Sequence, residues 1–234
     1  LEKAVPLFEK GGRVFYMGAG TSGRLGVLDA SEIPPTFQMP ADRFIGIIAG
    51  GDGALRKSSE GKEDDTNGGR AVLLENKIRE NDILIGIAAG GTTPYVLGAF
   101  EIAKKISTQI LTAYIVCTDI PKPITADHLI YLSTGPEVVT GSTRMKAGTA
   151  TKMVLNMIST TMMIQTGRVY DNLMVDLKAS NEKLIDRAIR IIVNLTKLSR
   201  DEAFELLKKA EFQTKPAIVM FFKKVELKEA LVLI

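Results

Sequence analysis

The chain has 234 residues, enough to bury a full core, and its 45% hydrophobic and 24% charged content is ordinary for a globular protein. Its 30 basic and 27 acidic residues leave a net charge of +3, too balanced to indicate binding to nucleic acid or an anionic membrane. A single cysteine, Cys117, excludes a disulfide framework and indicates a reducing, cytoplasmic location; with only one histidine, no metal site is expected.

From Val14 to Gln165, short apolar runs alternate with helix-like segments. The runs are nearly continuous and rich in β-branched residues, as in strands that are buried on both faces. This alternation predicts a three-layer α/β/α domain with a five-stranded parallel sheet, which we place at residues 1–167. The expected strands are Val14–Met17, Phe44–Ala49, Ile83–Ala88, Ile110–Cys117 and Leu129–Leu132.

Helices are expected between these strands, and each has a recognisable boundary. Pro34 and Pro35 are expected to end the first helix, and Pro94 occupies a favoured first-turn position in the third. After the sheet the pattern contains helices only, which predicts a small C-terminal helical appendage within residues 168–234. The expected helices are Gly23–Ile33, Gly68–Asn76, Pro94–Ile106, Arg144–Gln165, Asn181–Leu195, Arg200–Ala210 (with Ser199 as its N-cap) and Pro216–Lys224.

The first strand runs into a loop with glycines at Gly18, Gly20 and Gly23 and then into a helix. Such a turn directs backbone N–H groups and the positive end of a helix dipole at one point, which makes an anion site. The spacing also satisfies the dinucleotide pattern G-x-G-x-x-G, but Asp52 is the only candidate for the acid that a dinucleotide site needs. The hydroxyls of Thr21 and Ser22 favour a phosphate monoester.

A second glycine loop, Ala88–Pro94, follows the third strand and again places hydroxyls at the start of a helix. In parallel sheets, ligands bind at the carboxyl ends of the strands, where both loops fall. Two such loops at one edge predict a phosphosugar site, the alternative being that both are only tight turns.

Several long segments resemble the sugar isomerase (SIS) domain and, more narrowly, the N-acetylmuramic acid 6-phosphate etherase family, which is related to the glucokinase regulatory protein. The resemblance covers nearly the whole chain, and the family's N-terminal lead-in is expected before Leu1. The segments are GAGTSGRLGVLDASEIPPTF, IAGG, EGKEDD, GIAAGGTTPYVLGA, EVVTGSTRMKAGTATKMVLNM and GRVYDNLMVDLKASNEKL.

The resemblance implies a carbon–oxygen lyase that converts N-acetylmuramic acid 6-phosphate into N-acetylglucosamine 6-phosphate and D-lactate. It implies a homodimer with active sites near the subunit interface, and the chemistry itself needs no metal or redox cofactor. The family's two catalytic glutamates fall on Glu32 of DASE and Glu63 of EGKED. Its phosphate contacts fall on Thr21, Ser22 and Gly23 and on Ala89, Gly90, Gly91, Thr92 and Thr93, although the family commonly reads Ser-Gly-Arg-Thr over the last four positions.

Two carboxyl groups suit this chemistry, because elimination needs a base at C2 and an acid at the C3 oxygen. By spacing, Asp29 and Glu32 share one helix face near the first loop. Glu63 lies in a glycine-flanked acidic loop, for which polarity alone would predict a solvated turn.

The segment from Glu137 to Thr149 has two interpretations. It is either a surface loop that caps a helix or a substrate contact, in which Glu137, Ser142 and Thr143 bind the sugar while nearby cations hold the leaving carboxylate. Two other functions also fit a phosphosugar pocket: a phosphosugar-sensing regulator and a phosphosugar isomerase. The single SIS half argues against the regulator, and the pair of glutamates argues against the isomerase.

Overall fold

The computed structural model describes residues 1–59 and 61–234, so Glu60, the first residue of the EGKEDD motif, lies outside the described residues. The strands are β1 (Val14–Gly18), β2 (Phe44–Ile48), β3 (Ile83–Ile87), β4 (Leu111–Val116) and β5 (His128–Tyr131). The helices are α1 (Ala4–Glu9), α2 (Gly20–Phe37), α3 (Gly53–Arg56), α4 (Thr66–Glu75), α5 (Pro94–Ile106), α6 (Lys146–Gln165), α7 (Glu182–Thr196), α8 (Arg200–Lys209), α9 (Thr214–Lys223) and α10 (Leu227–Val232).

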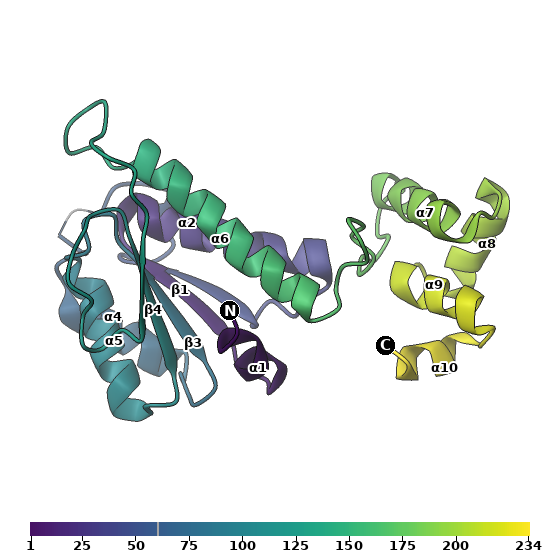
Figure 1. The fold of residues 1–234 in the computed structure, drawn as a ribbon, viewed down its shortest axis with the longest axis horizontal. Coiled ribbons are helices and arrows are strands. Elements are labelled where there is room, and N and C mark those ends of the chain that lie inside the picture. The colour runs from purple at the N-terminus through teal and green to yellow at the C-terminus, as the bar shows by residue number, and fades with distance from the viewer. Residues whose placement is uncertain (60) are drawn as a thin grey trace. The chain divides into compact units, whose positions relative to one another are not determined.

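The strands form one five-stranded sheet in the order β2-β1-β3-β4-β5, and every neighbouring pair is parallel. Helices α2 and α6 cover one face of the sheet, and α4 and α5 cover the other (Figure 1). The predicted three-layer α/β/α architecture is therefore confirmed. Both glycine loops leave the sheet from adjacent central strands, β1 and β3.

The core of the sheet domain is formed by the central strands. All residues of β1 and β3 are buried, as the continuous apolar runs predicted, and Tyr16, Phe100 and Tyr114 are among the largest fully buried side chains. The same expectation is wrong for β5, whose residues are only partly buried or exposed. Strand β5 is the edge strand and pairs only with β4, so one side of it lacks a neighbour.

Helix α2 differs from the prediction at both ends. It begins at Gly20 rather than Gly23, and it continues through Pro34 and Pro35 to Phe37. Both prolines lie in the last turn, so the hydrogen bonds that they cannot donate are lost only at the end of the helix, while their fixed φ suits helical backbone. The short helices α3 and α10 were not predicted, because four to six residues give too little periodicity to read.

The chain divides into two compact units, residues 1–33 with 40–162 and residues 34–39 with 163–234. The second unit carries α7 to α10. Asn181 caps α7 by accepting a hydrogen bond from Leu184 N, and Ser199 caps α8 in a capping box with Glu202, as predicted for Ser199. Nowhere in the described part of the chain is a helix long and apolar enough to cross a bilayer.

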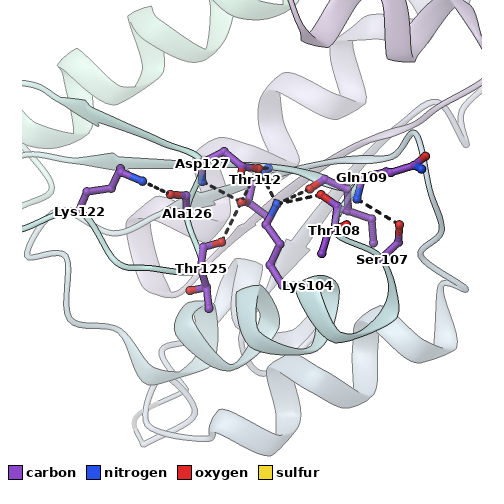
Figure 2. Close-up of polar contacts among 10 residues, drawn as sticks. Lys104, Ser107, Thr108, Gln109, Thr112, Lys122, Thr125, Ala126 and Asp127 are labelled. Atoms are coloured by element: carbon purple, nitrogen blue, oxygen red, sulfur yellow. Dashed lines mark hydrogen bonds and ion pairs between the residues drawn. The ribbon is translucent and has the colours of Figure 1, made fainter.

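Polar networks fix the loops at the amino ends of the strands. Asp127 accepts hydrogen bonds from Lys104 Nζ at 2.6 Å and from Thr112 N at 2.9 Å, which ties the chain before β5 to α5 and β4 (Figure 2). Burial alone would raise the pKa of Asp127, but these bonds hold it below its ordinary value.

A buried ion pair joins the starts of β1 and β3. Asp82, which has no exposed surface, accepts bonds from Arg13 Nε at 3.2 Å and Arg13 Nη2 at 2.6 Å. It also accepts bonds from the backbone N–H groups of Arg13 and Arg79, both at 2.9 Å.

We predict that Asp82→Ala lowers the free energy of unfolding by about 3–5 kcal/mol, because it leaves the Arg13 guanidinium without its buried partner. Urea denaturation monitored by circular dichroism measures the change. Asp42→Ala, at an exposed residue, is the matched control and should change stability by less than about 0.5 kcal/mol. Equal stability of the two variants would contradict this role for the ion pair.

Candidate functional site

Each glycine of the first loop occupies a position where a side chain would be strained or would clash. Gly20 has a φ of +52°, which a glycine adopts without strain. A Cβ added at Gly18 would lie 2.8 Å from Gly23 N, and one at Gly23 would lie 2.6 Å from Ile48 Cγ1. The strand, the loop and α2 therefore pack more closely than any side chain at these positions would allow.

The start of α2 presents backbone donors that no carbonyl of the helix accepts. The first helical hydrogen bond runs from Gly23 N to Ala19 O at 3.2 Å. The N–H groups of Gly20, Thr21 and Ser22 precede it and have no acceptor within the helix. They lie at the positive end of the helix dipole, so this turn is suited to an anion.

The second loop is shaped by the end of β4. Ala89 O accepts hydrogen bonds from Cys117 N at 2.9 Å and from Thr118 Oγ1 at 3.1 Å. In a trans peptide the N–H points opposite to the C=O, so the Gly90 N–H is directed away from β4. Gly91 has a φ of +73°, and a Cβ there would lie 2.4 Å from Ile120 Cδ1.

The two loops meet at a cavity of about 330 Å³. Glu63 and Asp64 are the charged residues among the described lining, so an anion bound here would be held by helix starts and backbone N–H groups and not by a cationic side chain. Asp64 was not predicted; its place beside Glu63 in the acidic loop is the signal that could have indicated it. Eight of the predicted site residues line the cavity: Thr21, Ser22, Glu63, Ala89, Gly90, Thr92, Thr93 and Thr143. The rest of the lining was not among the predicted site residues: Ala19, Gly20, Asp64, Ala88 and Pro94.

Other predicted residues lie outside this lining, and most have structural partners. Gly23 and Gly91 donate their N–H groups to Ala19 O and Ala88 O, and Ser142 N donates to Val139 O. Glu137 accepts hydrogen bonds from Ala147 N at 2.9 Å and Lys146 N at 3.0 Å at the start of α6. These backbone bonds lower the pKa of Glu137, so this carboxylate caps α6.

Glu32 is also remote from the cavity. At a rise of about 1.5 Å per residue it lies about 18 Å along α2 from Gly20, and it is exposed. Asp29 instead faces the interior, where Oδ1 accepts bonds from Asn156 Nδ2 at 2.6 Å and Ser159 Oγ at 3.1 Å. The prediction that Asp29 and Glu32 share one helix face near the first loop is therefore wrong, because Asp29 is buried and Glu32 is exposed.

Within residues 1–59 and 61–234, no group of three or more histidine, cysteine or carboxylate residues is placed to hold a metal ion.

We predict that Gly90→Ser is tolerated, whereas Gly91→Ala is not. A Cβ at Gly90 would meet only Thr92 Oγ1, at 3.9 Å, and Gly90 does not have a positive φ. Gly91→Ala should lower stability by about 1–3 kcal/mol and weaken the binding of inorganic phosphate. Thermal unfolding and titration calorimetry measure both effects, and equal damage in the two variants would contradict this account of the loop.

Comparison with known proteins relates both parts of the chain to one group of proteins. The model for the glucokinase regulatory protein N-terminal SIS domain matches residues 1–104, and that for the C-terminal lid domain of glucokinase regulatory protein matches residues 171–230. A putative phosphosugar isomerase involved in capsule formation from Bacteroides fragilis NCTC 9343 shares the fold. Its TM-score is 0.53 at 18% identity, and the match covers 73% of this chain and 81% of that one.

Sequence similarity over nearly the whole of this chain is much higher to one family. The N-acetylmuramic acid 6-phosphate etherases of Yersinia pestis (strain Pestoides F) and Yersinia pseudotuberculosis serotype O:1b (strain IP 31758) are each 50% identical to this chain over 232 residues. The matches cover 98% of this chain and 78% of each relative. Identity at this level over nearly the whole chain shows descent and not only a shared fold. The chain belongs to the N-acetylmuramic acid 6-phosphate etherase family.

Proposed function

We propose that this chain cleaves the D-lactyl ether of N-acetylmuramic acid 6-phosphate, giving N-acetylglucosamine 6-phosphate and D-lactate in the recycling of cell-wall sugars. The observation that carries the proposal is the position of Glu63, which lines the same cavity as both glycine loops. A carboxylate beside an anion site can act on a sugar whose phosphate the loops hold. The single cysteine, Cys117, supports a cytoplasmic location for this reaction.

The phosphate is held by neutral donors in this proposal. The N–H groups of Gly20, Thr21 and Ser22 and the Gly90 N–H supply donors, and the hydroxyls of Ser22 and Thr93 add to them. Hydrogen bonds to a charged acceptor contribute roughly 1.5–3 kcal/mol each, so a few suffice for specific binding.

The reaction is an elimination followed by an addition. In the open-chain aldehyde form of the sugar, Glu63 removes the C2 proton, and the electron pair forms the C2–C3 double bond as the C3–O bond breaks. Glu32 protonates the departing lactyl oxygen. Water then adds at C3 and a proton returns to C2, so the atoms balance as a net hydrolysis and two carboxyl groups serve as acid and base.

Glu32 reaches the cavity from a second copy of the chain in this proposal. Its distance along α2 places it too far to serve the cavity of its own chain. The surface near it is apolar: Leu28 on α2 and Met153 and Met157 on α6 are 46%, 59% and 64% exposed. Asp29 joins α2 to α6 through Asn156, so these side chains belong to adjoining helices. We propose that this surface forms a homodimer interface.

A regulatory function is the second candidate, because both matching family models describe the glucokinase regulatory protein. A regulator would bind the phosphosugar without converting it. Incubation with N-acetylmuramic acid 6-phosphate and an enzymatic assay for D-lactate separates the two, since only the etherase releases lactate.

We predict different defects for the neutral isosteres of the two glutamates. Glu63→Gln should abolish exchange of the C2 proton with deuterated solvent and with it lactate release. Glu32→Gln should impair lactate release more than exchange. Each loss should reach about 10²–10⁴-fold. NMR of the C2 proton and the lactate assay measure the two steps; normal exchange in Glu63→Gln would reverse the roles, and normal lactate release in both variants would refute the mechanism.

We predict that mixing the two inactive variants restores activity. If each site takes Glu32 from one subunit and Glu63 from the other, a heterodimer of Glu32→Gln and Glu63→Gln holds one intact site. Random assortment after denaturation and refolding should then recover about one quarter of wild-type lactate release. Each variant refolded alone is the control, and no recovery in a mixture shown to contain heterodimer would place both glutamates in one chain.

A further inference from the structure

The loop that carries Glu63 is tied to the start of α5. Glu63 O accepts a hydrogen bond from Tyr95 N at 2.9 Å. Tyr95 is the second residue of α5, and an N–H in a first helical turn has no acceptor within its helix. The backbone of the proposed base therefore caps the helix whose first residue, Pro94, lines the phosphate cavity.

The same loop is held at its other end by α4. Asp65 is the N-cap of α4, and its Oδ1 accepts a hydrogen bond from Gly68 N at 2.8 Å. Thr66, the first residue of α4, lies directly against Gly98 of α5: a Cβ added at Gly98 would be 2.4 Å from Thr66 O. A Cβ at Gly69 would similarly lie 2.0 Å from Tyr95 O.

We propose that Gly98 and Asp65 are positioning residues for Glu63. The absent side chain at Gly98 lets α4 approach α5, and the Asp65 cap fixes where the loop enters α4. Together they fix the distance between the carboxyl group of Glu63 and the phosphate. The start of α5 faces the same phosphate in the proposed function. This inference rests on the proposed function, in which Glu63 is the base at C2.

A methyl group at position 98 forces the start of α4 outward. A contact of 2.4 Å with a backbone oxygen must lengthen by about 1 Å to reach ordinary van der Waals separation. Displacement of a catalytic group by about 1 Å can cost about 10²-fold in rate. The phosphate donors lie on α2 and the second loop, so binding should change much less than turnover.

The test compares Gly98→Ala with Gly53→Ala, where an added Cβ would meet nothing within 4 Å. We expect Gly98→Ala to lower kcat for lactate release and the rate of C2 exchange together by about 10–100-fold, with KM and inhibition by inorganic phosphate within about threefold. Gly53→Ala should match wild type. Activity is expressed per folded protein, measured by circular dichroism.

A second pair of variants keeps the inference testable if Gly98→Ala does not fold. Asp65→Ala removes the cap and should lower kcat with little change in KM, whereas Asp65→Asn keeps a capping oxygen and should restore it. Wild-type kcat in both Asp65→Ala and folded Gly98→Ala, with Glu63→Gln inactive, would overturn the positioning role. Full activity of Glu63→Gln would instead overturn the base assignment in the proposed function.

Discussion

The register between β1 and β3 is the constraint on which the rest of the structure depends. Gly18 pairs with Ile87, so both strands end at the same level of the sheet. Each strand is followed by a glycine loop and a helix, and parallel strands direct these loops to one edge. A shift of one residue in this register would separate the two sets of donors and turn the buried strand residues to the opposite faces.

In the proposed function, neutral groups create an anion site at this edge. Helix starts and peptide N–H groups are fixed by the fold and lose little freedom on binding, whereas a lysine or arginine side chain must be ordered. Close approach of backbone to ligand requires small residues, and the packing around Gly18, Gly23 and Gly91 shows how tightly the loops are set against their strands. Glu63 and Asp64 line the same cavity as the loops, so the proposed anion site lies beside two carboxylates.

Helices α2 and α6 are held together by a buried polar contact. Asp29 is buried between them, and one of its oxygens is satisfied by Asn156 and Ser159. This polar contact fixes how the two helices pack, because an unpaired buried carboxylate would be costly. Their outer surface is apolar at Leu28, Met153 and Met157. Leu28 lies one helical turn before the exposed Glu32 on α2.

The sequence by itself determined the features that depend on local chemistry. Buried strands appear as continuous apolar runs, Pro94 and Ser199 begin their helices where predicted, and both glycine loops fall at one edge of the sheet. Only the tertiary structure decided the rest. Spacing on α2 could not separate buried Asp29 from exposed Glu32, because burial depends on where α6 packs. The fold likewise decided that Gly23 and Gly91 serve packing and hydrogen bonding beside the cavity, since their neighbours Ile48 and Ile120 are distant in the chain.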